Sequence, residues 1–341
     1  MTNHSGIRPS HHENNMGHLQ FCTSCNRPVR ASLIIATLLV LGSAGIGPSA
    51  LALEPSNKVK QEVFASQDLA VEALVATVRS GESNAVLKIL GPDAKRIANS
   101  GDAVADQAAR QRFLAAYDEG HKTALEGDDR ATLIIGKDDF AFPIPLVKAG
   151  ASWRFDAKAG EEEILDRRIG ANELSTIDVM RAYVEAQRAY ALEDRDGKGI
   201  QYAQKLLSSS GKKDGLYWAV SDGEPESPLG PLVAGVRAEG YEARSGAPSP
   251  YHGYLFRILK AQGKNAAGGA LNYVAGGRMI GGFGLIAVPA KYGNSGVMTF
   301  VINHDGVVFE RDFGANTTNI AAAIQSFDPD SKWRKVGGSK R

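Results

Sequence analysis

Three histidines occur after residue 52, and His252 has the surroundings most suggestive of chemistry. It lies in a Tyr-His-Gly-Tyr segment at the start of an expected strand, where an imidazole could act as a general base. The same part of the chain contains no cysteine and no G-x-S-x-G segment, so no nucleophilic triad is recognisable. The sequence therefore allows one enzymatic hypothesis, a metal-independent hydrolase in which a carboxylate works with His252. Arg278 and Glu173 are the further catalytic candidates.

A calcium site is the second chemistry to weigh. Asp194 and Asp196 occupy the first and third positions of a D-x-D-x-x-G pattern that ends at Gly199. Lys198 takes the fifth position, and Lys205 stands where a calcium loop carries its bidentate glutamate. These departures favour a solvated turn at the end of the preceding helix. Calcium-dependent adhesion is the alternative.

Cys22 and Cys25 form a C-x-x-C motif near several histidines, a pattern typical of zinc sites. They are the only cysteines of the chain, and they lie upstream of a segment that we expect to be removed. We interpret the motif as part of a long leader, for which Met16 is an alternative start. The mature chain then has no disulfide, no thiol nucleophile and no cysteine metal site. The neighbouring histidines are His4, His11, His12 and His18.

Two other motif-like segments favour structural roles. Charged residues crowd positions 154–173, where Glu163 and Arg167 have the i, i+4 spacing of an exposed helical ion pair. Acid–base chemistry by paired carboxylates is the alternative there. The glycine-rich residues 276–282 precede an expected strand, so they match neither a P-loop nor a dinucleotide fingerprint. We expect no cofactor and no nucleotide ligand.

Residues 31–46 form an uncharged apolar run that follows Arg27 and Arg30. The run leads into the A-x-A sequence from Ala50 to Ala52, which is the order of a secretory signal peptide. A membrane span needs roughly 20 apolar residues, and this run is shorter and interrupted by glycine and serine. We expect cleavage after Ala52 and a periplasmic or secreted protein with no stable membrane span. An uncleaved anchor is the alternative.

The N-terminal half predicts helices with a small meander between them. Ser66 is the expected N-cap of the first helix and Gly81 its stop. Pro143 and Pro145 indicate that the middle strand is an edge strand or irregular. The expected helices cover residues 68–80, 85–90, 104–126, 161–168 and 176–192, and the expected strands cover 131–135, 140–147 and 153–155.

The last of these helices begins at an apparent capping box, Ser175 with Asp178. Tyr183 and Val184 belong to its apolar face, and the polar Gln187 interrupts that face at i+7. One polar residue in three turns still favours a helix.

The pattern changes after a turn-rich segment of residues 197–250 to the period of two that strands show. The Asn-His-Asp-Gly sequence of residues 303–306 is a hairpin signal, because glycine suits the positive φ that such turns need. The expected strands cover residues 254–260, 279–288, 297–302 and 307–310, and a closing helix covers 318–327.

Several long segments together resemble one family of exported proteins of Gram-negative bacteria, domain of unknown function 2950. The resemblance covers nearly the whole mature chain and implies a periplasmic or secreted location, and it supplies no catalytic residues. The segments that carry it include ILGPDAKRIANSGDAVAD (89–106), FPIPLVKAGASWRFDAKAGEEEILDRRIGANEL (142–174), YHGYLFRILKAQG (251–263), GGRMIGGFGLIAVPAKYGNSGVMTF (276–300) and DGVVFERDFG (305–314).

The segments GYLFRIL and GLIAVPAKYGNSGVMTFVINHDGVVF also resemble the strand region of type IV pilins and pseudopilins. This resemblance implies an antiparallel sheet in the last third of the chain. Pilins carry their apolar assembly helix directly before the head domain, whereas the apolar run of this chain lies far upstream. We therefore do not expect membership of a pilus.

These patterns predict an α+β fold, with a helical N-terminal half packed on a small antiparallel meander and then a C-terminal pilin-like antiparallel sheet. The expected boundaries are residues 1–52 for the cleaved signal, 53–195 for the α+β domain, 196–250 for a turn-rich connector and 251–341 for the β domain with its closing helix.

The composition of the chain also bears on which classes of function are expected. A formal net charge of +1 argues against a nucleic-acid binder. We expect an exported envelope protein that is a non-enzymatic binding or assembly module with a protein or glycan partner, and the hydrolase is the alternative. Convergence of His252, Arg278 and a carboxylate in one cleft would favour the enzyme. Their scatter, with an exposed apolar patch, would favour the binding module.

Overall fold

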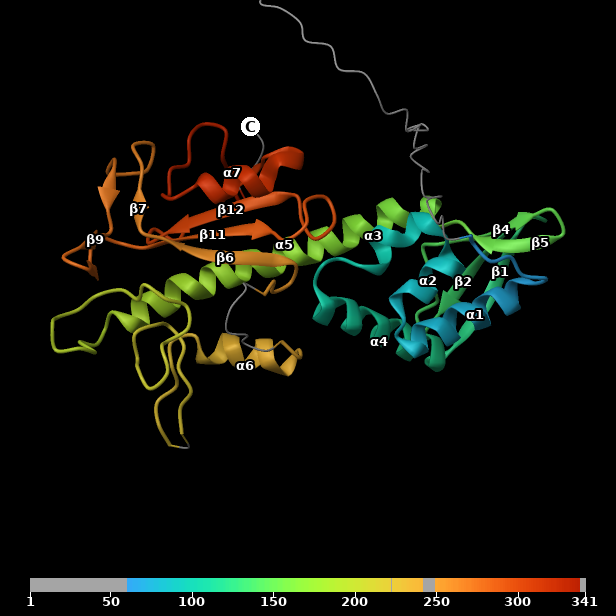
Figure 1. The fold of residues 1–341 in the computed structure, drawn as a ribbon, viewed down its shortest axis with the longest axis horizontal. Coiled ribbons are helices and arrows are strands. Elements are labelled where there is room, and N and C mark those ends of the chain that lie inside the picture. Colours follow the sequence, from blue (N-terminus) through green and yellow to red (C-terminus); the bar gives the residue numbers. More distant parts are fainter. Residues whose placement is uncertain (1–59, 222, 242–248, 338–341) are drawn as a thin grey trace, which may run out of the picture. The chain divides into compact units, whose positions relative to one another are not determined.

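The computed structural model describes residues 60–221, 223–241 and 249–337. Its helices and antiparallel sheets confirm the predicted α+β class (Figure 1). The predicted signal peptide and the C-x-x-C motif of Cys22 and Cys25 lie outside the described residues.

The N-terminal part packs helices on a small antiparallel sheet. Helix α1 (Gln67–Ser80) begins at Ser66, whose side chain accepts a hydrogen bond from the Leu69 amide, and it ends at Gly81 in the left-handed conformation. The buried side chains of α1 share one core with those of the sheet. The sheet order is β1-β2-β4-β5, with β3 beside β2. The other elements of this part are α2 (Ser83–Leu90), α3 (Lys95–Ala98), α4 (Ala103–Glu119), β1 (His121–Glu126), β2 (Arg130–Ile135), β3 (Phe140–Ala141), β4 (Leu146–Ala149) and β5 (Ser152–Phe155).

The helix predicted over residues 104–126 is wrong in its last two turns. Helix α4 ends before Gly120, and residues 121–126 form strand β1. Strand β1 pairs with β2 along its whole length, from His121 opposite Ile135 to Glu126 opposite Arg130. The stretch contains good helix formers such as Ala124, Leu125 and Glu126, so the ladder with a β-branched partner strand overrides the local preference.

The strand predicted over residues 140–147 is interrupted, and its two ends are β3 and β4. Pro143 and Pro145 have no amide hydrogen to donate to a neighbouring strand, so the ladder stops between them. The interruption lets the following helix come close. A Cβ atom at Gly160 would lie 2.5 Å from the carbonyl oxygen of Pro143, so only glycine fits this contact.

Helix α5 (Ala157–Tyr190) is one continuous helix, so the prediction of two helices and of a capping box at Ser175 is wrong. Two polar residues near the expected break have partners elsewhere in the fold. Asn172 donates to the Ser295 carbonyl oxygen at 2.8 Å, and Arg168 donates to the Asn294 side chain at 2.7 Å. Tertiary contacts therefore replace the turn that the local sequence suggests.

The C-terminal part is an antiparallel sheet of order β14-β13-β12-β11-β6. Figure 1 shows α5 and α7 (Thr317–Ala323) on opposite faces of this sheet. The alternation of side chains agrees: Leu285 and Phe300 pack with α5, whereas Ile286 and Val301 pack with α7. The strands are β6 (Tyr254–Leu259), β11 (Gly284–Pro289), β12 (Met298–Asn303), β13 (Phe309–Asp312) and β14 (Arg334–Lys335).

The strand predicted over residues 279–288 is divided into β10 (Arg278–Met279) and β11 by two glycines. Gly282 has φ +138°, and a Cβ atom there would lie 2.7 Å from Nδ1 of His304. The glycines therefore mark a close backbone approach. The predicted turn-rich segment also contains a helix, α6 (Gly230–Ala238).

The connector after α5 is held to that helix by Gln187, the residue that interrupts the apolar stripe. Its side-chain amide donates to the Ala203 carbonyl oxygen at 2.8 Å and accepts from the Ala203 amide at 2.8 Å. Both partners are buried. The polar break in the helix is thus a docking point for the connector.

Candidate functional site

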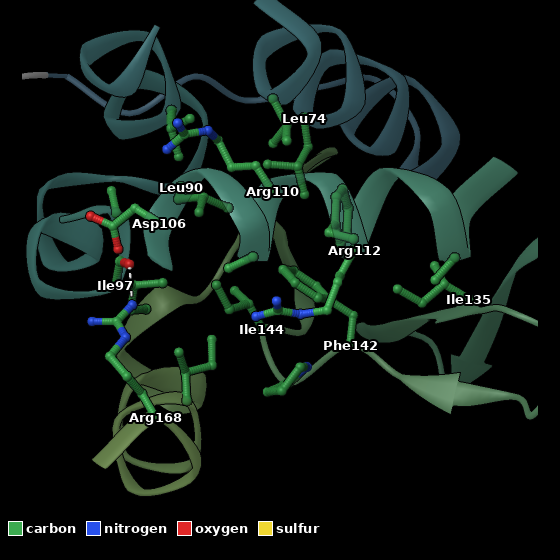
Figure 2. A pocket seen from close by; sticks show the side chains of 18 of the residues that line it. Leu74, Leu90, Ile97, Asp106, Arg110, Arg112, Ile135, Phe142, Ile144 and Arg168 are labelled. Carbon is green, nitrogen blue, oxygen red and sulfur yellow. Dashed lines mark hydrogen bonds between the residues drawn. The ribbon is translucent and has the colours of Figure 1, made fainter. Parts of the chain in front are cut away.

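The N-terminal part contains an apolar pocket of about 550 Å³ between helices α1, α2 and α4 and strand β2. Figure 2 shows Leu74 of α1, Leu90 of α2 and Ile135 of β2 around it. Phe142 and Ile144 come from the segment that the two prolines interrupt. This volume falls within the roughly 300–1,000 Å³ of ordinary ligand pockets, which are also mostly apolar.

Helix α4 covers one side of the pocket with very little burial. None of its 17 residues, all of which the structure describes, is buried. Phe113 and Ala116 nevertheless line the pocket, and the Phe113 ring lies 5.3 Å from the Phe142 ring between centroids. The helix therefore rests over the pocket without filling it.

Two of the four arginines that line the pocket are held by other groups. Arg168 donates to the Ile97 carbonyl oxygen at 2.6 Å (Figure 2), and burial lowers the pKa of its guanidinium. Arg167 forms an ion pair with Glu163 and lies over the Phe140 ring. These two cations contribute to the wall of the pocket.

Arg110 and Arg112 of α4 are the other two arginines of the lining, and Figure 2 shows their side chains extending from the helix in different directions. Among the described residues neither guanidinium forms an ion pair or a side-chain hydrogen bond. Asp106, the carboxylate of the lining, is turned to the Ser100 amide, from which it accepts hydrogen bonds at 3.1 and 3.3 Å. Hydrocarbon walls beside two available guanidinium groups suit a ligand with an apolar tail and an anionic head.

His252 lies at a turn beside a carboxylate and aromatic rings. Its Nε2 is 3.0 Å from Oε2 of Glu239, and its ring lies 4.3 Å from that of Tyr251 between centroids. Burial, with Glu239 nearby, raises the pKa of Tyr251 to about 12. The backbone of His252 has φ +45°, a left-handed conformation that costs a non-glycine residue roughly 1–2 kcal/mol.

Asp102 holds this strained turn in place. One of its oxygens accepts from the Gly253 amide at 2.9 Å and from the Tyr241 hydroxyl at 2.8 Å. The other caps α4 by accepting from the Ala105 amide at 3.0 Å. Burial, and then the contact with Asp102, raises the pKa of Tyr241. Asp102 therefore connects the start of α4 to the turn that carries His252.

The other two catalytic candidates do not join His252. Glu173 accepts hydrogen bonds from two successive backbone amides at the start of β12, both at 2.9 Å. Arg278 donates to the Ile200 carbonyl oxygen at 3.2 Å, in the connector. No hydrogen bond or ion pair among the described residues links either side chain to His252.

Asp194 and Asp196 close a turn with N–H donors. Asp194 accepts from the amides of Gly199 at 2.8 Å and Lys198 at 3.1 Å, and these bonds, the one from Gly199 first, lower the pKa of its carboxyl. Asp196 accepts from the Gln201 side chain at 3.0 Å. In the described parts of the chain, no group of three or more His, Cys, Asp or Glu side chains is placed to hold a metal ion. The contacts favour the solvated turn.

The sequence did not predict the apolar pocket. Its periodicity indicates that Phe113, Ala116 and Tyr117 form one face of α4, but not how fully the opposite wall fills the space. The available signal is the small size of Ala109 and Ala116, which line the pocket beside the arginines.

The family model described as "Protein of unknown function (DUF2950)" matches residues 61–336. No curated protein and no solved structure matches the chain. The likeness of the C-terminal sheet to pilin head domains therefore stays a prediction. Within residues 60–337, apart from the two gaps, no helix has the length and hydrophobicity that crossing a membrane requires.

Proposed function

The chain belongs to the DUF2950 family of proteins of unknown function, and we propose that it is an exported binding module for an amphiphile. The proposed ligand is a single-chain molecule with an anionic head, of the fatty-acid kind. The observation that carries the proposal is the apolar pocket of about 550 Å³ with Arg110 and Arg112 beside it.

The physical chemistry of the pocket supports this ligand class. Each methylene group transferred from water into an apolar pocket contributes about 0.8 kcal/mol. A carboxylate head can accept two parallel hydrogen bonds from one guanidinium, which fixes its orientation. The ordering of a flexible chain offsets part of this gain, so we expect micromolar affinity.

The lining supports binding over catalysis. Its carboxylate, Asp106, is turned to a backbone amide, and its remaining titratable side chains are arginines, which do not exchange protons near neutral pH. A general acid and base would need titratable groups within reach of one substrate atom.

A fluorescent fatty acid whose emission rises in an apolar site tests the proposal. Protein purified after expression of the full-length chain should bind it with saturation, and an unlabelled saturated fatty acid should displace it. Ala116→Trp places a large ring in the pocket and should reduce affinity at least tenfold. Ala115→Trp is the matched control, because Ala115 is exposed on the same helix and does not line the pocket.

The anionic head is tested separately. Arg110→Gln with Arg112→Gln should weaken binding of the fatty acid about tenfold, which is about 1.4 kcal/mol, and should leave a fatty alcohol of equal length unaffected. Lys88→Gln, an exposed cation of α2 outside the lining, is the charge control. Equal losses with Ala115→Trp and Ala116→Trp would contradict the proposed pocket.

Export is part of the same proposal. It is supported by the apolar run at residues 31–46 and by the A-x-A sequence that ends at Ala52. We expect a C-terminally tagged chain to fractionate with the periplasm or the medium and to begin at residue 53. Ala50→Lys should block cleavage and leave the precursor in the cell. A purified protein that retains residue 1 in the envelope fraction would show an uncleaved anchor instead.

A second candidate function is the metal-independent hydrolase, which the pairing of His252 with Glu239 at 3.0 Å favours. Its expected signature is hydrolysis of small esters with a rate that His252→Gln abolishes. Tyr251→Phe keeps the ring beside the imidazole and should retain activity. Rates equal in the wild type and in His252→Gln would remove this candidate and leave the binding module.

A further inference from the structure

A second pocket, also of about 550 Å³, lies at the connector after α5, and it is polar. Five cationic side chains and two anionic ones line it, an excess of three positive charges. The anionic residues are Asp196 and Asp214, and the cationic ones are Arg195, Lys205, Lys212, Lys213 and Lys260.

Both carboxylates of the lining already accept hydrogen bonds from neighbouring side chains. Asp214 accepts from Lys205 at 2.7 Å, and Asp196 accepts from the Gln201 side chain at 3.0 Å. Lys212 and Lys260 form no ion pair among the described residues and are exposed. The pocket thus retains cations that have no anionic partner in the described fold.

Arg195 is the cation of this pocket that neighbouring side chains hold in place. Its guanidinium lies 5.0 Å from the ring centroid of Tyr190 and 5.0 Å from that of Trp218. The side chain is only 14% exposed and forms one ion pair, with Glu193 at 2.8 Å. Its buried Nε has no hydrogen-bond partner among the described residues. Aromatic packing therefore fixes a guanidinium with unused donor capacity at the pocket wall.

The loop that carries Lys212 and Lys213 is also held in place. Asp214 accepts from the amide of Ser209 at 2.7 Å and from its hydroxyl at 3.0 Å. The Tyr190 hydroxyl donates to the Lys213 carbonyl oxygen at 2.9 Å. Both lysines also line an adjoining pocket of about 460 Å³, so they stand between two cavities.

We propose that this pocket binds a small polyanion, a ligand with at least two phosphate or carboxylate groups. One anionic group would meet Arg195, and another would meet Lys212 and Lys213, which line both cavities. The proposal is independent of the amphiphile site, because none of these residues lines the apolar pocket.

Isothermal titration with pyrophosphate and with citrate tests the proposal and distinguishes phosphate from carboxylate recognition. At low ionic strength we expect at least one of them to bind with a Kd below about 1 mM. Raising the salt concentration should weaken binding strongly, because the contacts are ionic. Lys212→Gln with Lys213→Gln should reduce affinity at least tenfold, and Arg195→Gln should do the same.

Lys198→Gln is the matched control, since Lys198 is exposed in the same connector and outside the lining. It should leave the affinity within twofold of the wild type. If Arg195→Gln fails to fold, the exposed lysine variants decide alone. The proposal is overturned if neither anion binds, or if the Lys198 and Lys212/Lys213 variants lose equal affinity. Fatty-acid binding should be unchanged in all of them, so the two sites are tested separately.

Discussion

Helices α4 and α5 each lie against an antiparallel sheet, yet α5 buries twelve of its residues and α4 buries none. Met180, Tyr183 and Val184 of α5 fill the space above Phe300 and its neighbours. The corresponding positions of α4 are partly alanine, and the space beneath them is the apolar pocket. The same arrangement thus serves as a core in one region and as a container in the other.

The difference suggests that α5 mainly stabilises the fold, whereas α4 covers the proposed ligand site. Truncating a side chain in a filled core leaves a cavity and lowers the free energy of unfolding. A helix over a pocket loses less, because its side chains already make fewer contacts. We therefore expect α5 to contribute more to the folding free energy than α4 does, and we place the proposed ligand site in the region of α4.

The same substitution in both regions gives the largest expected contrast. Phe300→Ala removes a fully buried ring and should lower the free energy of unfolding by about 3–5 kcal/mol. Phe113→Ala removes a partly exposed ring at the pocket and should cost only about 1 kcal/mol. Denaturant titration measures both. Equal losses would mean that α4 is packed as tightly as α5, which would break the comparison.

Gln187→Leu tests whether the polar break in α5 is structural. It leaves the buried amide and carbonyl of Ala203 without partners, which should cost about 3 kcal/mol. Gln325→Leu is the control, because that side chain is exposed and makes a local bond to the Ala322 carbonyl oxygen and a long one, 3.5 Å, with Arg257. A cost near zero for Gln187→Leu would show that the connector docks on α5 by other contacts.

The sequence predicted elements well where local signals agree with the fold. The cap at Ser66 and the stop at Gly81 are confirmed, as is the Gly306 turn, which has φ +77°. Prediction failed where contacts with a distant segment determine the local conformation. The break expected near Ser175 is absent because Arg168 and Asn172 bond to the loop before β12.

The candidate sites could not be predicted from the sequence for the same reason. The contact of His252 with Glu239 depends on a turn whose positive φ no sequence pattern indicates. The apolar pocket depends on how far α4 stands from the sheet, which periodicity does not report. The contacts of Arg195 with the rings of Tyr190 and Trp218 likewise form only in the fold.

Asp102→Ala tests the link between the two regions. The substitution removes the cap of α4 and the acceptor for Gly253 and Tyr241, and it should cost about 2 kcal/mol. Hydrogen exchange should rise at the amides of Ala105 and Gly253. Asp93→Ala, an exposed carboxylate with no side-chain hydrogen bond among the described residues, is the control. Unchanged exchange at Gly253 would mean that the turn holds itself without α4.

The connector is held by polar contacts and has the smallest expected effect. The hydrogen bond from Lys205, followed by those from Ser209, lowers the pKa of Asp214 to about 2. In the unfolded chain an aspartate has a pKa near 3.9. The carboxylate therefore contributes stability that is present above a pH of about 4 and is lost as the pH falls to about 2.

Asp214→Asn should accordingly lower the free energy of unfolding by less than about 1 kcal/mol at neutral pH, because the side chain is partly exposed. The deficit against the wild type should shrink between pH 4 and pH 2, and urea titration at several pH values measures it. Since Lys205 forms the ion pair, Lys205→Gln should show the same pH dependence. A deficit that persists unchanged at pH 2 would mean that the charge of Asp214 does not stabilise its loop. The contrast between a charged connector and an apolar core would then lose its support.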